Sequence, residues 1–104
     1  MSRPAVFAPA ARIDLRAAIA WIAQENPAAA EALRDAALTG SLRIGARPSI
    51  GATRPFLGAD RFRCLLLRGF SYLMVYTADT DPPRILRALH TARDLPAIIG
   101  GSRS

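Results

Sequence analysis

Five side chains in the second half of the sequence have the chemistry to hold an anion: Arg61, Arg63, Arg87, Arg93 and the single histidine, His90. Arginine suits bidentate contact with phosphate or carboxylate groups. If the first three arginines project from a sheet face that no helix covers, they form, with Arg93 at the exit of the last strand, one basic and concave patch. The alternatives are an ordinary solvated strand face for the arginines and a structural role for the histidine.

The net charge predicts an anionic partner. Eight acidic residues stand against fourteen basic ones, all of them arginine, and the formal net charge is +6. An excess this large on 104 residues suggests nucleic acid or an acidic protein segment as the partner. A basic surface that is merely solvated would have the same composition. The apolar content of 51% is too high for a disordered chain and is sufficient for one core.

Composition also argues against other classes of site. One cysteine, Cys64, and one histidine allow neither an internal disulfide nor a zinc site. A glycine-rich phosphate loop is also absent from the sequence. From the two observations together we expect no metal and no cofactor. The sequence contains no run of 18 uncharged apolar residues and no signal-peptide core, which predicts a cytoplasmic protein without a membrane partner.

Two helices are predicted in the first half of the chain. Residues 9–24 begin with a proline, which is favoured at the first helical position, and carry an apolar stripe with the spacing i, i+3, i+4, i+7. Asn26 and Pro27 then have the types that cap and start a new helix, and residues 28–44 are rich in alanine and leucine. The short link between the two segments predicts a helical hairpin.

Four strands are predicted around this hairpin. Residues 3–8 fit a brief edge strand, and residues 61–67, 70–77 and 84–90 fit three longer strands joined by short links. Three consecutive strands of this kind form an antiparallel meander, and both helices must cover one of its faces.

The sequence thus predicts a single α+β domain over residues 1–99, in the order β-α-α-β-β-β, with a helical hairpin packed on a small antiparallel sheet. Residues 100–104 are expected to form a flexible tail.

Several sequence blocks, in order and at suitable distances, resemble one known superfamily. They are residues 9–15, 19–23, 26–30, 47–51, 69–76 and 85–94, the last reading Ile-Leu-Arg-Ala-Leu-His-Thr-Ala-Arg-Asp. Together they span residues 5–95 and look like a RelE/ParE-superfamily toxin of bacterial type II toxin–antitoxin modules. The β-α-α-β-β-β order reached from the periodicity is also the fold that this resemblance implies.

The resemblance leaves three functions open. The ending Leu-His-Thr-Ala-Arg-Asp resembles ParE-like members, which poison DNA gyrase, are not nucleases and are neutralised by a ParD-like antitoxin. A RelE-like ribosome-dependent mRNA endonuclease is the alternative, and its catalytic residues would be Arg61, Arg63, Arg87 and His90. Such cleavage needs a proton-transfer pair, and here the exit after His90 has neither a tyrosine nor a second histidine. A non-toxic binding or co-regulator module is the third possibility.

The ParE-like interpretation implies particular binding residues. Arg61, Arg63, Arg87 and Arg93 are expected to contact gyrase, and DNA would be reached only through the antitoxin. The antitoxin is expected to present an acidic tail that folds on binding. Its predicted contacts are Trp21, Leu15, Leu33 and Leu38 on the helices.

Overall fold

The computed structural model describes residues 3–95. Its elements run in the order β1 (Val6–Phe7), α1 (Pro9–Ala23), α2 (Pro27–Ala46), η1 (Pro55–Leu57), β2 (Phe62–Leu67), β3 (Tyr72–Thr77) and β4 (Arg84–His90). The predicted order β-α-α-β-β-β is confirmed. The predicted tail, residues 100–104, lies outside the described residues. Within residues 3–95 no helix is long and apolar enough to cross a membrane.

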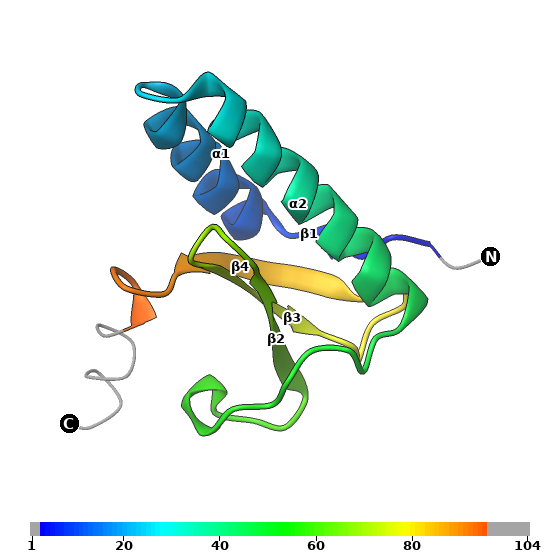
Figure 1. The fold of residues 1–104 in the computed structure, drawn as a ribbon. Helices are drawn as coiled ribbons and strands as arrows, with labels where there is room; N and C mark the ends of the chain where they lie inside the picture. Colours follow the sequence, from blue (N-terminus) through cyan, green and yellow to red (C-terminus); the bar gives the residue numbers. More distant parts are fainter. Residues whose placement is uncertain (1–2, 96–104) are drawn as a thin grey trace.

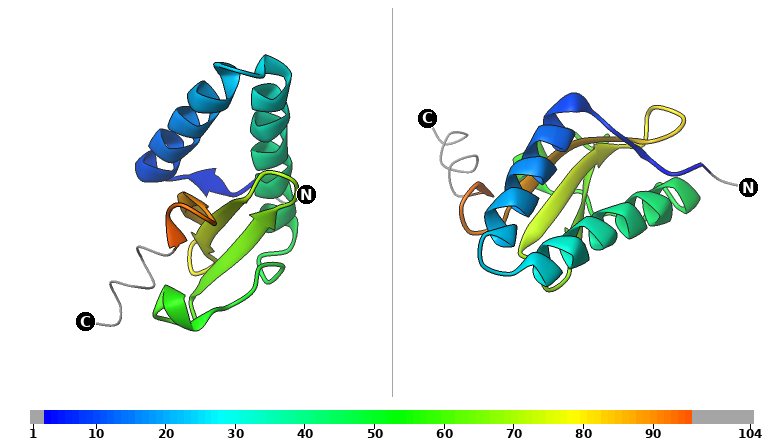
Figure 2. Two further views of the ribbon diagram at one scale, coloured as in Figure 1. Left: turned by 60° about the vertical axis from the view of Figure 1, so that its left-hand side comes forward. Right: turned by 90° about the horizontal axis from the view of Figure 1, so that it is seen from above.

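Both helices begin as the sequence indicates. Pro9 is the first residue of α1, and Ala8 before it offers no side-chain cap. At α2 the side chain of Asn26 accepts a hydrogen bond from the N–H of Ala29 at 3.1 Å, while Pro27 opens the helix. Figures 1 and 2 show the two helices as a hairpin that covers one face of the sheet.

The sheet is mixed, which corrects the predicted antiparallel sheet. Its strand order is β1-β4-β3-β2. β2, β3 and β4 form the antiparallel meander, but β1 pairs in parallel with β4. Parallel neighbours need a long crossover connection. Here the chain between β1 and β4 passes through both helices and the strands β2 and β3, which is long enough for such a crossover. Because β1 has only two residues, most of β4 has no neighbouring strand on that side.

Two apolar clusters lie on opposite faces of this sheet. The larger one packs both helices onto the sheet and includes Leu33, Ile44, Met74, Tyr76 and Ile85, each fully buried. The smaller one lies on the other face, where Phe56 and Leu57 of η1 and Leu95 cover four buried side chains of the strands: Cys64, Leu73, Val75 and Leu89. The face away from the helices is therefore partly covered.

Candidate functional site

An apolar groove runs between the two helices on their outer side. It encloses a cavity of about 270 Å³. Leu15 and Ile19 of α1 form one wall and Ala37 and Leu38 of α2 the other, while Phe7 of β1 closes one end. Leu38 remains 48% exposed, and Leu15 and Ile19 are half-buried, so apolar surface is open to a partner at this position.

Three arginines line the rim of the groove: Arg12 and Arg16 on α1, and Arg34 on α2. All three are exposed, and none forms an ion pair with another residue in the described range 3–95. An apolar floor bordered by unpaired guanidinium groups is complementary to an amphipathic segment that carries carboxylates.

The structure separates the four residues predicted to bind an antitoxin. Leu15 and Leu38 line the groove, as required for such a contact. Trp21 is 69% exposed but lies in another cavity, at the turn between the helices, with Ile22 and Asn26. Leu33 is fully buried in the larger cluster, so its predicted role in direct antitoxin binding is wrong. The face of α2 that carries Leu33 points to the sheet.

The predicted basic patch on one sheet face does not form. Arg63 lies opposite Tyr76, whereas Arg87 lies opposite Val75, and these two neighbours in β3 point to opposite faces. Arg61 precedes β2, and its guanidinium lies 4.8 Å from the centre of the Phe62 ring.

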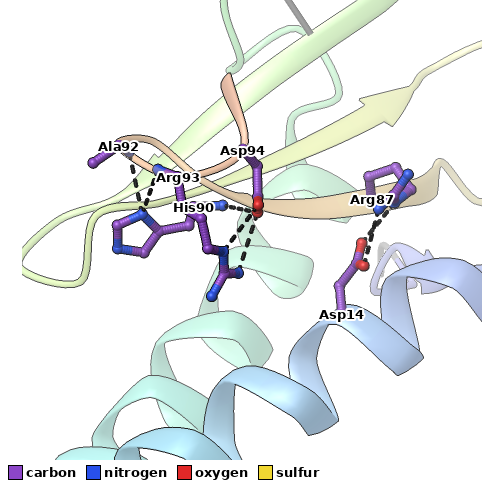
Figure 3. A network of polar contacts seen from close by, with 6 residues as sticks. All are labelled: Asp14, Arg87, His90, Ala92, Arg93 and Asp94. Atoms are coloured by element: carbon purple, nitrogen blue, oxygen red, sulfur yellow. Dashed lines mark hydrogen bonds and ion pairs between the residues drawn. The ribbon is translucent and has the colours of Figure 1, made fainter. Parts of the chain in front are cut away.

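Arg87 instead fastens helix α1 to the sheet. Its Nε and Nη2 atoms donate hydrogen bonds to the Asp14 carboxylate at 2.7 and 3.1 Å (Figure 3). The same carboxylate accepts a bond from the backbone N–H of Ala88 at 2.9 Å. That N–H belongs to the part of β4 beyond β1, so Asp14 takes the place of a neighbouring strand. The hydrogen bond that Arg87 donates to the Asp14 carboxylate raises the pKa of Arg87.

Arg93 and His90 belong to a second polar network at the end of β4 (Figure 3). The Asp94 carboxylate accepts the N–H of His90 at 2.7 Å and a 3.0 Å bond from Arg93 Nε. Nδ1 of His90 accepts the backbone N–H groups of Ala92 and Arg93 at 3.2 and 3.0 Å. These contacts hold the turn after β4 and give His90 a structural role. Arg87 and Arg93 do border one common cavity of about 300 Å³, but each is paired there with an aspartate.

The Asp94 network predicts a pH effect on stability. The hydrogen bond from Arg93 lowers the pKa of Asp94 below its value in the unfolded chain. The ionised carboxylate therefore stabilises the fold above the unfolded pKa of about 3.9, and this contribution is lost as the pH falls through the lower folded value. An asparagine at position 94 keeps an acceptor oxygen for the N–H of His90, but its amide group does not titrate. We expect urea unfolding to show a stability gap between wild type and Asp94→Asn at pH 6 that narrows toward pH 2.5.

A matched control is Asp35→Asn on the exposed surface of α2, because Asp35 forms no ion pair within the described part of the chain. Its stability difference from wild type should be small at both pH values. A gap for Asp94→Asn that stays constant over this range would show that the carboxylate has the same pKa in the folded and unfolded states.

Tyr76 and Arg63 hold the loop that follows α2. The Tyr76 hydroxyl donates to the carbonyl of Pro48 at 2.6 Å and accepts the N–H of Gly51 at 2.8 Å. Arg63 Nη1 donates to the carbonyls of Gly51 and Ser49 at 2.8 and 3.4 Å. Burial raises the pKa of Tyr76. With both roles of its hydroxyl occupied, Tyr76 is unsuited to proton transfer.

Sequence reasoning missed the residues that make the groove distinctive. Arg12 and Arg16 lie one helical turn apart beside the apolar stripe of α1, a spacing that marks them as the edge of that stripe. Arg34 and Phe7 reach the groove only through the tertiary fold. Asp14 was the other omission, and no local pattern distinguishes its carboxylate from a solvated one.

The comparisons with known proteins agree with this fold. Curated proteins give no match to the sequence. Among solved structures, a chain from the "Chromosomal ParDE TA system from P. aeruginosa" is similar to this one with a TM-score of 0.69 and 20% sequence identity. The match covers 86% of this chain and 96% of the other. At that identity the likeness concerns the fold.

A family model gives the more specific result. The model described as "ParE toxin of type II toxin-antitoxin system, parDE" matches residues 5–95, which include all the elements from β1 to β4. The chain therefore belongs to the ParE toxin family.

Proposed function

We propose that this protein is a toxin that inhibits DNA gyrase in the cytoplasm and is neutralised by a cognate ParD-like antitoxin. The observation that carries the neutralisation is the groove between α1 and α2, with apolar walls and three exposed arginines on its rim. An acidic antitoxin segment that folds into an amphipathic helix fits this surface. Its apolar side would contact Leu15, Ile19 and Leu38, and its carboxylates would reach the arginines.

The groove gives a direct test of antitoxin binding. In Leu38→Asp a carboxylate replaces an apolar wall of the groove and would have to be desolvated on binding. We expect the antitoxin affinity, measured by calorimetry, to fall about tenfold or more. Replacing the three rim arginines with glutamine should weaken binding and flatten its dependence on salt. Circular dichroism of the wild-type titration should show a gain in helix.

The matched control is Ile13→Asp, which adds the same charge to an exposed apolar residue on the other flank of α1. Ile13 is 63% exposed and does not line the groove. Its variant should bind the antitoxin as wild type does. If Ile13→Asp weakens binding as much as Leu38→Asp, the antitoxin occupies another surface of the helical hairpin.

We further propose that Arg61, Arg63, Arg87 and Arg93 contact gyrase, although as separate positions, since they do not form one patch. Arg61 is exposed, and the side chains of Arg87 and Arg93 keep 51% and 62% of their surface accessible beside their ion pairs. In this proposal they contact gyrase through charge, without any covalent chemistry, and DNA is contacted only by the antitoxin. The absence of a free proton-transfer pair around His90 in the described residues supports an inhibitor in preference to a ribonuclease.

His90 distinguishes the two kinds of toxin. If the protein binds gyrase, His90→Ala should keep toxicity, because the imidazole only holds backbone N–H groups of the turn after β4. If it cleaves mRNA with His90 as acid or base, the same change should lower the rate by about 10²–10⁴. The measurements are growth arrest, supercoiling by purified gyrase and mapping of mRNA ends, with circular dichroism to confirm folding.

The outcomes separate the functions as follows. Loss of toxicity in a folded His90→Ala protein, with mRNA cleavage seen only for wild type, would contradict gyrase inhibition. Wild-type expression without any growth arrest would instead indicate a non-toxic module. Since the turn depends on His90, we expect a modest loss of stability in the variant in every case.

A further inference from the structure

The outer edge of β2 has a gap in its backbone pairing. β2 is the edge strand on the side of the sheet opposite β1. Cys64 exchanges two hydrogen bonds of 2.9 Å with Ala52, so its N–H and C=O point away from β3. In an antiparallel pair this direction alternates along the strand, and Leu66, two residues further on, must also direct its N–H and C=O outward.

Leu66 has no backbone partner on that side within residues 3–95. Its side chain is 50% exposed as well. A free N–H, a free C=O and an exposed apolar side chain at one position are the features of an edge that can accept another strand. The neighbouring Arg68 and Gly69 of the β2–β3 turn are also exposed and leave this end of the edge uncovered.

The opposite edge of the sheet is closed by contrast. β1 covers the start of β4, and beyond it the N–H groups of Ala88 and His90 are bonded to the carboxylates of Asp14 and Asp94. Carboxylate groups thus replace a strand along β4, whereas nothing in the described range does so at Leu66. Of the two edges of the sheet, only the β2 edge therefore leaves both backbone groups of a strand residue, Leu66, without a partner among the described residues.

The charge around β2 indicates what kind of chain would pair there. Residues 54–68 contain four arginines, Arg54, Arg61, Arg63 and Arg68, and one acidic residue, Asp60. None of the four forms an ion pair with any residue of the described chain. This surplus favours an acidic partner. The outward C=O of Leu66 is an acceptor, which suits a polypeptide backbone and repels a phosphate group.

We propose that the β2 edge at Leu66 binds an extended, acidic segment of a partner protein by adding it to the sheet as a further strand. The segment would exchange backbone hydrogen bonds with Leu66, place an apolar side chain beside it and direct a carboxylate toward Arg68. This site is separate from the groove between α1 and α2, and it does not depend on the toxin function. Few backbone bonds are available, so the affinity of a short peptide will be low.

The test uses a capped octapeptide of alternating valine and glutamate as the probe. We expect its addition to shift the backbone amide signals of β2 in NMR spectra and to slow hydrogen exchange of the Leu66 amide about tenfold at saturation. The same peptide with lysine in place of glutamate should not do so. Both measurements use the wild-type chain and therefore do not depend on a variant folding.

Leu66→Pro adds a sharper comparison, because proline removes the outward N–H and leaves the hydrogen bonds to β3 in place. Its matched control is Leu66→Ala, which removes the same apolar side chain and keeps the N–H. We expect Leu66→Pro to bind the glutamate peptide several-fold more weakly than Leu66→Ala, and Arg68→Gln to weaken binding as well. Circular dichroism confirms that each variant is folded.

Five results would overturn the proposal. They are equal binding of the lysine peptide, equal binding by folded Leu66→Pro and Leu66→Ala, and peptide binding without protection of the Leu66 amide. The fourth is protection of that amide that rises with protein concentration when no peptide is present, which would make a second copy of this chain the occupant. If a single-stranded oligonucleotide protected Leu66 and the glutamate peptide did not, the edge would be a nucleic-acid site.

Discussion

Replacing Leu33 with alanine should lower the free energy of unfolding by about 2–5 kcal/mol. Leu33 is fully buried between α2 and the sheet, and truncation leaves a cavity among its neighbours in the larger apolar cluster. Leu38→Ala on the same helix should change the stability by about 0.5 kcal/mol or less, since its side chain is half exposed. Urea unfolding of the two variants, followed by circular dichroism, gives both values.

Partner binding should show the reverse order. Leu38→Ala removes part of the groove wall and should weaken antitoxin binding, while a folded Leu33→Ala protein should bind nearly as wild type does at low temperature. Equal losses of stability in the two variants would mean that the face of α2 toward the sheet is not the one that carries Leu33. The assignment of the groove would then be wrong as well.

The elements of this fold were predictable because their signals are local. A proline after Ala8 and the Asn26-Pro27 pair mark the helix starts through capping and fixed φ, and both starts are found at these residues. Alternation of side chains located β4 at the observed residues 84–90. The parallel pairing of β1 with β4 depends on where the helical hairpin returns the chain, and no local pattern contains that information.

The buried face of α2 was harder to predict for a physical reason. Its sequence is rich in alanine, which is compatible with both a buried and an exposed position, so that the leucines do not define one stripe. Leu33 faces the sheet, while Leu38 and Leu42 remain largely exposed. The glycine at position 40 marks the true contact face, since it lies against Met74 and Leu67.

The predicted arginine patch was wrong because alternation along a strand shows only which of its residues share a face, and not how the faces of two strands correspond. It places Arg61 and Arg63 on the same side of a strand but does not say which side the helices cover. Arg63 falls on the helix side and binds loop carbonyls, and Arg87 reaches around the open edge of β4 to Asp14. The groove arginines were missed because Arg12 and Arg16 lie on α1 and Arg34 lies on α2, and they share a surface only once the two helices are packed side by side.

Two glycines of α2 provide the last prediction, because alanine should act differently at each. At Gly40 an added Cβ would lie 2.5 Å from Cε of Met74, the end of a flexible side chain. A rotation of that methionine relieves the contact, and alanine also favours the helix by about 1 kcal/mol. We expect Gly40→Ala to stay within about 1 kcal/mol of the wild-type stability.

At Gly45 the added Cβ would meet backbone that has no such freedom. It would collide with the carbonyl oxygen of Arg3 and lie 2.8 Å from Cα of Pro4. The segment before β1 must then move away from α2, although Ala5 is bonded there to the carbonyl of Ser41 at 2.9 Å. Because overpacking of this kind typically exceeds the helix gain, Gly45→Ala should lose about 1–3 kcal/mol in urea unfolding.

The site of that loss can be located by hydrogen exchange. The N–H groups of Val6 and Ala8 are bonded to the carbonyls of Pro83 and Ile85, and both bonds depend on the position of the segment that Gly45 supports. In Gly45→Ala these two amides should exchange faster than in Gly40→Ala, while amides of β3 change in both variants only with the global stability. Phe7, which closes one end of the groove, follows directly after Val6, so the same variant should also weaken antitoxin binding. Wild-type stability of Gly45→Ala together with full protection of Val6 and Ala8 would contradict the close approach of the N-terminal segment to α2.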